Sequence, residues 1–170
     1  IGVDKFEKDV DNSSYNTDMN ADYVVLYVLD NENKKCTALQ ISRDTMVDIN
    51  KLGLGGVKVG TYNGQLSLSY SEGTGGKISC RNTADAVSAL LGGVRISHYA
   101  SVTMDTVATL NDLVGGVELT VLDSFSGIDS TLVKGETVLL NGEQALKYIR
   151  SRQGMDDSTN NNRMNRQKQY

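Results

Sequence analysis

The chain of 170 residues contains no proline and no tryptophan, a single histidine (His98) and two cysteines. Cys36 and Cys80 have none of the spacings of a metal-binding motif and allow only one disulfide. Cys36 falls in an apolar stretch, where a cysteine is most often a small buried hydrophobe; a bridge to Cys80 is the alternative if the protein is extracytoplasmic. Ser42 has no histidine near it, and we expect His98 to be structural. Ser-His-Asp hydrolysis therefore fits poorly.

Long hydrophobic runs are also missing. No apolar stretch approaches the roughly 20 residues that a membrane-spanning helix needs, and the N-terminus has no signal-peptide pattern. The net charge of −4 and pI near 5.0 argue against bulk binding of nucleic acid, which favours a broad basic face. An apolar fraction of 39% and the length fit one globular domain. We expect the chain to be part of a longer protein.

Hydrophobic periodicity predicts alternating strands and helices. Residues 22–30 and 36–42 form a hairpin in this interpretation, and residues 51–79, with eight of the 17 glycines, form loops with short strands. The remaining predicted elements are a helix from Asn82 that ends at Gly92-Gly93, a strand over 98–103, a helix over 105–114 capped by Asp105, a strand over 117–122, a helix that starts at Asn141 with Gln144 in a capping box, and a helix from about 158–160. Together they predict a single-domain α/β fold in which helices cover a mixed central sheet in α-β-α layers.

Arginines are concentrated at the C-terminal end. Four of the seven lie within the last 21 residues, where five basic side chains stand against Asp156 and Asp157. Guanidinium groups stay charged, and each can bind two oxygens of a phosphate or carboxylate at once. The cluster therefore indicates a polyanionic ligand. Its arginines are Arg150, Arg152, Arg163 and Arg166.

The last predicted helix presents a polar stripe. Arg163, Arg166, Gln167 and Tyr170 follow at i, i+3, i+4 and i+7, so they share one helix face. A solvated polar face is the alternative. Two arginines and an amide on one side would suit an anion.

A second polar cluster, Ser42-Arg43-Asp44, ends the second predicted strand. Ligands of α/β folds usually bind beyond the strand ends, although an ion pair that pins the following loop would explain the same residues. Asp4 and Asp22 add carboxylates near the N-terminus.

In this order the segments resemble the LytR–CpsA–Psr family of bacterial cell-wall ligases over nearly the whole chain. The chain departs from the family pattern at Asn20, where members often carry arginine. The matching segments are Gly2–Asp4, Asp22–Leu26, Ile41–Thr45, Gln65–Tyr70, Asp112–Val117, Gly142–Arg152 and Arg163–Gln167.

The resemblance implies that residues 1–170 are a catalytic domain whose N-terminal membrane anchor is absent from this chain. It implies transfer of an anionic or capsular glycopolymer from an undecaprenyl-pyrophosphate carrier to peptidoglycan through a phosphodiester, on the extracytoplasmic face of a Gram-positive-type membrane. No nucleic-acid partner is expected. The implied catalytic residues are Arg43, Asp44, Arg150 and Arg152; the pyrophosphate ligands are Arg43, Arg150, Arg152, Arg163, Arg166 and Gln167; and Asp4 and Asp22 hold Mg²⁺ or Mn²⁺.

Several roles stay open. Asp22 and Asp44 are both candidates for the general base, and Asp156 or Asp157 would hold Arg152 or Arg163. Two other functions use the same residues: binding of polyprenyl pyrophosphate or anionic polymer without turnover, and hydrolysis of a lipid pyrophosphate. A lipid channel or an ordinary core would explain the apolar positions of the two middle helices. These positions are Val87, Leu90, Leu91, Val107, Leu110 and Val114.

Overall fold

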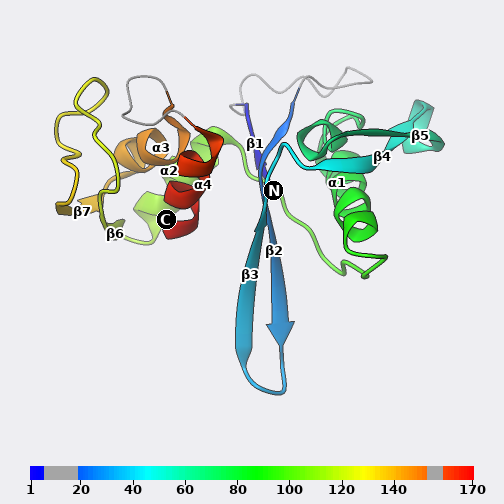
Figure 1. Cartoon of the computed structure of the whole chain (residues 1–170), viewed down its shortest axis with the longest axis horizontal. Helices are drawn as coiled ribbons and strands as arrows, with labels where there is room; N and C mark the ends of the chain where they lie inside the picture. The colour runs from blue at the N-terminus through cyan, green and yellow to red at the C-terminus, as the bar shows by residue number, and fades with distance from the viewer. Residues whose placement is uncertain (6–18, 153–158) are drawn as a thin grey trace. The chain divides into compact units, whose positions relative to one another are not determined.

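The structure, a computed structural model, describes residues 1–5, 19–152 and 159–170. The chain divides into two compact units, Ile1–Thr103 and Met104–Tyr170, and each is described by itself (Figure 1). The assignment of residues 1–170 to one catalytic domain stays a prediction.

The first unit contains two small antiparallel sheets. β2 (Ala21–Asp30) lies between β1 (Gly2–Val3) and β3 (Lys35–Ile41), and the expected hairpin is confirmed with Val24 opposite Ile41. β4 (Met46–Leu52) and β5 (Lys58–Gln65) form the second sheet. The glycine-rich stretch is thus more regular than expected, since it supplies β5 and the short 3₁₀ helices η2 (Leu54–Gly56) and η3 (Leu66–Ser69).

The core of this unit lies between the sheets and α1 (Gly76–Leu90). α1 begins six residues before the predicted start, because Gly75 and Gly76 adopt positive φ and the Ser79 hydroxyl accepts a hydrogen bond from the Gly75 backbone. Asn82, the expected cap, is instead buried, and its amide donates to the carbonyls of Asn50 and Ser69. The side chains that form this core are Val3, Met19, Ala21, Val24, Ile41, Val47, Ile49, Leu66, Tyr70, Cys80, Ala86 and Val87.

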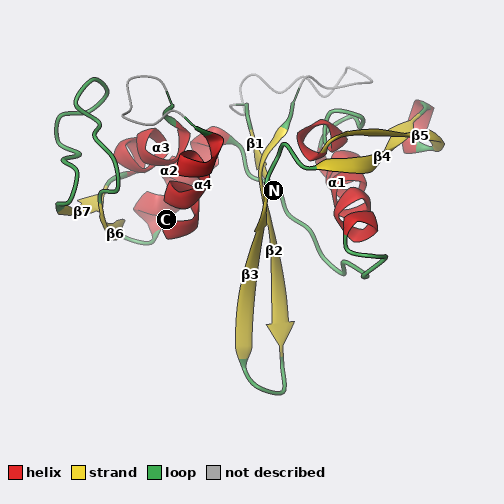
Figure 2. Ribbon diagram, viewed as in Figure 1, coloured by secondary structure: helices red, strands yellow, loops and turns green. Residues whose placement is uncertain are grey.

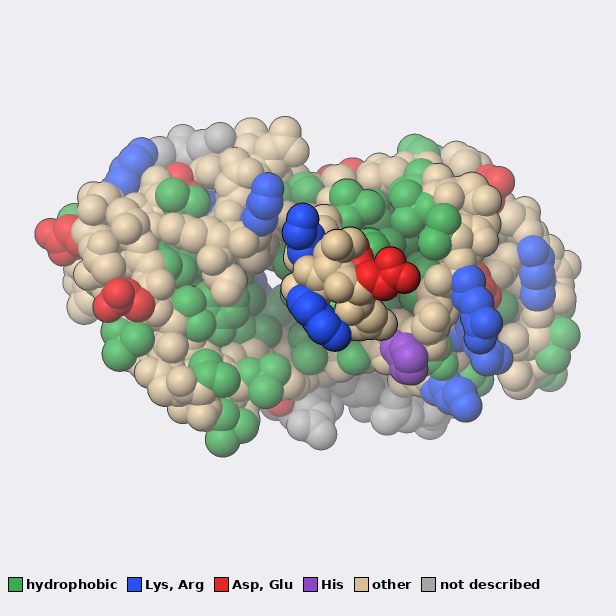
Figure 3. Space-filling model, turned by 90° about the horizontal axis from the view of Figure 1, so that it is seen from below, with side chains coloured by type: hydrophobic (Ala, Val, Ile, Leu, Met, Phe, Trp, Pro, Cys, Tyr) green, Lys and Arg blue, Asp and Glu red, His purple; other side chains and the backbone are tan. Residues whose placement is uncertain are grey.

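The distal half of the β2–β3 hairpin lies outside this core. Leu29 is 67% exposed, and apolar side chains are visible at many places on the surface in Figure 3. Cys36 lies on this part of the hairpin and is exposed, so the expectation that it is buried is wrong; Cys80 is buried, and both thiols are free. The aliphatic and β-branched residues marked the strand correctly, but burial depends on what packs against the strand.

The second unit packs helices against a two-stranded sheet. α2 (Met104–Leu113) precedes β6 (Val117–Thr120), which pairs with β7 (Thr137–Leu140), and α3 (Gly142–Arg150) and α4 (Asn160–Gln169) follow (Figure 2). Leu119, Val121, Phe125, Leu132, Leu140, Ala145 and Tyr148 form its core.

Most of the expected elements of the chain are confirmed, with three corrections beyond those above. The predicted strand over 98–103 is reduced to an isolated bridge between Gly2 and Val102. The strand predicted to reach Leu122 ends at Thr120, and Asp105 lies inside the first turn of α2. The mixed α/β class is confirmed. No helix in the described parts of the chain is both long and apolar enough to cross a membrane.

Candidate functional site

Arg43 joins two strands of the first unit. It follows β3 and forms an ion pair with Asp22, which lies at the start of β2, although 21 residues separate the two in sequence. Both side chains are largely withdrawn from solvent, at 26% and 13% exposed. A partly buried ion pair is screened less than a surface one. Asp22 therefore orients Arg43, and the cation compensates the carboxylate.

The turn after β3 holds Arg43 and Asp44 in place. The Asp44 amide donates to the Ser42 hydroxyl at 3.3 Å, and the Arg43 carbonyl accepts a hydrogen bond from the Ser67 amide at 3.0 Å. Asp44 lies 3.5 Å from Arg43 Nε, and its side chain is 44% exposed. Arg43 thus lies close to two carboxylates, Asp22 and Asp44, of which Asp44 is the more accessible; the sequence motif indicated only Asp44.

Asp4 is held at the same end of the sheet. Its Oδ1 accepts from the Asn20 amide at 2.7 Å, and its Oδ2 accepts from the Asn20 side chain at 3.3 Å. Asn20 and Asp22 are two residues apart on an extended segment, so their side chains leave it on the same face. By this alternation we expect Asp4 and Asp22 to lie on one face of the β1–β2 pair.

Two carboxylates on one face suit the predicted metal ion. Mg²⁺ usually takes one or two carboxylates and completes its octahedron with water and substrate phosphate. Among the described residues, no group of three or more His, Cys, Asp or Glu side chains gathers at one place. Asp4 and Asp22 offer the carboxylate oxygens that Mg²⁺ prefers, and their role as its ligands stays a prediction.

The second unit displays Arg150 and Arg152 around the end of α3. The predicted capping box is confirmed at the start of this helix, where Gln144 N donates to Asn141 Oδ1 at 2.9 Å and Asn141 N donates to Gln144 Oε1 at 3.0 Å. The helix ends at Arg150, and Ser151 is extended, with φ −62° and ψ 141°. Arg150 is exposed and Arg152 is partly exposed.

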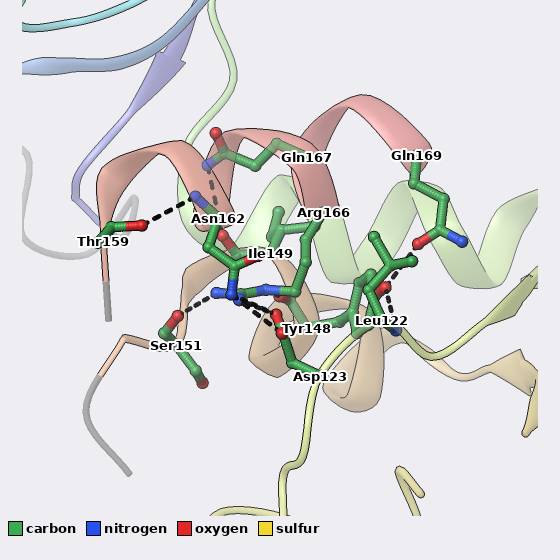
Figure 4. A network of polar contacts seen from close by, with 10 residues as sticks. All are labelled: Leu122, Asp123, Tyr148, Ile149, Ser151, Thr159, Asn162, Arg166, Gln167 and Gln169. Carbon is green, nitrogen blue, oxygen red and sulfur yellow. Dashed lines mark hydrogen bonds and ion pairs between the residues drawn. The ribbon is translucent and has the colours of Figure 1, made fainter. Parts of the chain in front are cut away.

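Polar side chains of α4 bind the last carbonyls of α3. Arg166 Nε donates to the Tyr148 carbonyl at 2.9 Å, its second terminal nitrogen donates to the Ser151 carbonyl, and Gln167 Nε2 donates to the Ile149 carbonyl at 3.3 Å (Figure 4). The final carbonyls of a helix have no partner within the helix, and a cation there is favoured by the helix dipole. The expected stripe on α4 is real, and this part of it faces α3.

Asp123 completes this network, and sequence reasoning did not single it out. It is 6% exposed and accepts from Arg166 Nη1 at 2.5 Å, while Asn162 Nδ2 lies 2.9 Å from each of its oxygens (Figure 4). The signal was present, because Asp123 directly follows the predicted strand over 117–122, as Arg43-Asp44 follows the earlier one. Its partners are 39 and 43 residues away.

Two aromatic rings, Phe125 and Tyr148, pack beside the network. Phe125 stacks on Tyr148 with ring centroids 5.3 Å apart, and the Arg166 guanidinium lies 5.7 Å from the Phe125 ring. Burial raises the pKa of the Tyr148 hydroxyl, despite an opposing hydrogen bond from the Leu122 amide. Tyr148 therefore stays protonated at neutral pH and donates to Gln169 Oε1 at 2.5 Å.

The structure places the other predicted residues as follows. Arg163 is 4% exposed, and one of its terminal nitrogens donates to Asn160 Oδ1 at 2.9 Å. Asp156 and Asp157, expected to hold an arginine, lie outside the described residues. Of the apolar channel candidates, Val87 is in the core, whereas Leu90, Leu110 and Val114 are 41%, 49% and 72% exposed.

Comparison with known proteins decides the family. The model of the LytR_cpsA_psr family matches residues 1–170. The chain belongs to the LytR–CpsA–Psr family. It is 33% identical to the polyisoprenyl-teichoic acid–peptidoglycan teichoic acid transferase TagV of Bacillus subtilis over 156 residues, which are 88% of this chain and 36% of that protein. It is 30% identical to the corresponding TagU of Enterococcus faecalis over 134 residues, 78% of this chain and 39% of that protein.

Solved structures of the family share the fold. The crystal structure of Bacillus subtilis TagV matches with a TM-score of 0.65 and 30% identity, over 88% of this chain and 54% of that one. The chain spans 32–44% of the length of the curated relatives that it matches. The family model establishes membership, whereas activity, substrates and partners of the whole protein do not follow from a match of this length.

Proposed function

We propose that this LytR–CpsA–Psr chain carries the catalytic residues of a phosphotransferase that moves a glycopolymer from an undecaprenyl-pyrophosphate carrier to peptidoglycan. The observation that carries the proposal is the arginine between two carboxylates: Arg43 pairs with Asp22 and lies 3.5 Å from Asp44. A fixed cation beside candidate bases is what attack on a phosphorus atom requires. The transferase names of TagV and TagU support the same reaction class.

In the proposed reaction a sugar hydroxyl of peptidoglycan attacks the phosphorus that carries the glycan. A phosphorus–oxygen bond forms to the acceptor, and the bond to the undecaprenyl phosphate breaks, so the glycan is left in a phosphodiester. The hydroxyl proton passes to a carboxylate, for which Asp44 and Asp22 are the candidates. Arg43 offsets negative charge that spreads over the phosphoryl oxygens.

Arg150 and Arg152 are proposed as pyrophosphate ligands of the second unit. They flank the extended Ser151. A guanidinium can bind two oxygens of one phosphate at the same time, because the spacing of its N–H groups matches the spacing of those oxygens. Mg²⁺ or Mn²⁺ on Asp4 and Asp22 would supply Lewis-acid charge to the phosphate oxygens. We propose that the reaction takes place on the extracytoplasmic face of a Gram-positive-type membrane, with the whole protein anchored there.

Turnover of a short lipid-pyrophosphate-linked glycan tests this function. The assay is run with and without a peptidoglycan acceptor, and with Mg²⁺ or EDTA. The expected product is glycan joined to acceptor, formed only when acceptor and Mg²⁺ are both present. Phosphate-ended glycan that forms regardless of acceptor would replace the proposal with a hydrolase. Binding of the donor without any product would replace it with a carrier-binding module.

A further inference from the structure

Arg166 was expected from the sequence to contact substrate, yet its side chain is buried and its guanidinium donates to three protein acceptors. Nε, Nη1 and Nη2 each donate to a protein acceptor, namely Tyr148 O, Asp123 Oδ2 and Ser151 O, and the side chain is 1% exposed. A guanidinium that is buried and committed on three nitrogens has little left to offer a phosphate. Its role must then be exerted through the groups that it holds.

The most informative of these groups is the Ser151 carbonyl. This oxygen belongs to the peptide bond that links Ser151 to Arg152, and Ser151 is the residue at which the chain leaves the helix. Peptide groups are planar, so fixing the carbonyl also fixes the direction in which Arg152 continues. The Tyr148 carbonyl, held by the same guanidinium, belongs to the last turn of α3, which carries Arg150.

Asp123 sets the orientation of that guanidinium. Its two oxygens are shared between Arg166 and the Asn162 amide, so the carboxylate is held from one side by a residue near the start of α4 and from the other by the buried cation. A charge-assisted hydrogen bond of 2.5 Å in a buried place is strong and directional. Phe125 under the guanidinium plane limits its remaining freedom.

We propose that Asp123 and Arg166 are positioning residues that hold the Ser151–Arg152 peptide, and thereby present Arg150 and Arg152 to the pyrophosphate. This inference rests on the proposed function. It gives Arg166 a different part from the other arginines of the cluster: Arg150 and Arg152 contact substrate, and Arg166 acts through them. It also assigns a role to Asp123, which was not among the residues expected from the sequence.

The test must separate positioning from folding. Removal of Arg166 alone would leave the Asp123 carboxylate buried without its cation, which by itself destabilises a protein strongly. The double variant Asp123→Leu/Arg166→Met removes both charges, and such replacements are often neutral for stability. Lys168→Met on the exposed side of α4 is the matched control, because it removes a cation from the same helix without touching the network.

Two measurements are made on the full chain. Hydrogen exchange of the Ser151 amide, which donates to the Lys147 carbonyl at 3.1 Å, reports whether the end of α3 stays ordered. A mutant cycle with Arg152→Ala reports whether Arg166 acts through Arg152. In the double variant we expect exchange at Ser151 to be at least about tenfold faster, a Tm within about 5 °C of wild type, and a kcat/KM at least about tenfold lower. Adding Arg152→Ala to the double variant should lower its kcat/KM by less than about a further threefold.

The outcomes are distinct. Unchanged exchange at Ser151 in a folded double variant overturns the inference, whatever its activity. A wild-type kcat/KM in the double variant also overturns it. So does a triple variant in which Arg152→Ala lowers kcat/KM by as much as it does in the wild-type protein. If the double variant does not fold, Arg166→Lys keeps the buried charge but offers fewer donors in a different geometry, and normal exchange with normal turnover in that variant overturns the inference. If the wild-type protein has no transferase activity but the double variant exchanges faster at Ser151, the proposed function is wrong and the structural role of Asp123 and Arg166 stands.

Discussion

Both carboxylate oxygens of Asp4 accept hydrogen bonds from Asn20, one from its backbone amide and one from its side chain. At the position of Asn20 the resemblance to the LytR–CpsA–Psr family leads us to expect arginine. Asn20 still orients the Asp4 carboxylate, because its backbone amide and its side-chain amide each donate a hydrogen bond to it. It adds no positive charge beside Asp4, so the neighbouring carboxylates keep more negative charge for a cation.

Asp22→Ala should lose the dependence on Mg²⁺ together with the activity. The variant removes one of two proposed metal ligands and leaves Arg43 with Asp44 as its remaining carboxylate neighbour. The measurement is the initial rate against Mg²⁺ concentration. Asp85→Ala, an exposed carboxylate on α1, serves as control and should titrate as wild type. A wild-type Mg²⁺ curve for Asp22→Ala would contradict the assignment of Asp22 as a ligand.

Arg43→Ala should lower kcat by about 10²–10³, the range seen when one donor to a developing negative charge is removed. Steady-state kinetics with the lipid-linked donor measure it. Arg81→Ala removes an exposed arginine from the same unit and should leave kcat within about twofold of wild type. If Arg43→Ala retained a third or more of wild-type turnover, Arg43 would be a structural ion-pair residue that pins the loop after β3.

Arg150→Ala and Arg152→Ala should each lower kcat/KM by at least about tenfold, because each removes a donor to a developing negative charge, while the fold stays intact. Both side chains reach solvent, so their loss creates no buried cavity, and surface substitutions usually change the free energy of unfolding by less than about 0.5 kcal/mol. Thermal unfolding and turnover are measured on the same preparations. Turnover at the wild-type rate in either variant would remove that arginine from the proposed pyrophosphate ligands.

Gly142→Ala should destabilise the second unit. A Cβ at this position would lie 2.5 Å from the Ala108 carbonyl oxygen and 2.7 Å from Asp112 Oδ2, so α2 and α3 would have to move apart. Overpacking of this kind costs about 1–3 kcal/mol, measured as the free energy of unfolding in urea. Gly60→Ala is the matched control, since its Cβ would meet nothing within 4 Å. Equal stability of the two variants would mean that the approach of α2 and α3 is looser than described.

Acid should weaken the loop before β7 through Asp129. Hydrogen bonds from the Thr131 hydroxyl, then from Lys147, lower the pKa of the Asp129 carboxyl below its ordinary value. The carboxyl therefore contributes stability above its unfolded pKa of about 4, and this contribution is lost as the pH falls through the folded pKa. Thermal unfolding between pH 6 and pH 2 measures it, at roughly half-unit steps. Asp129→Asn should flatten the decline below about pH 4; an identical profile would exclude Asp129 as its source.

Local patterns predicted local structure well. The Asn141–Gln144 capping box lies at the start of α3 as expected, and the paired glycines 92–93 and 115–116 end α1 and α2 with positive φ. Each of these signals acts within one turn of chain. The start of α1 was missed because Asn82 has the chemistry of a helix cap, and its burial between η3 and β4 became visible only in three dimensions.

The sequence by itself determined the family and the α/β class and predicted the residues of the candidate site, because ordered motifs and hydrophobic periodicity are properties of neighbouring residues. Only the tertiary structure decided which charges meet within each unit. Asp22 meets Arg43 across 21 residues, and Asp123 meets Arg166 across 43. It also distinguished the arginines at the C-terminal end, since Arg150 is exposed and Arg166 is buried. The difference arises because α4 packs its Arg166 face onto the open carbonyls at the end of α3.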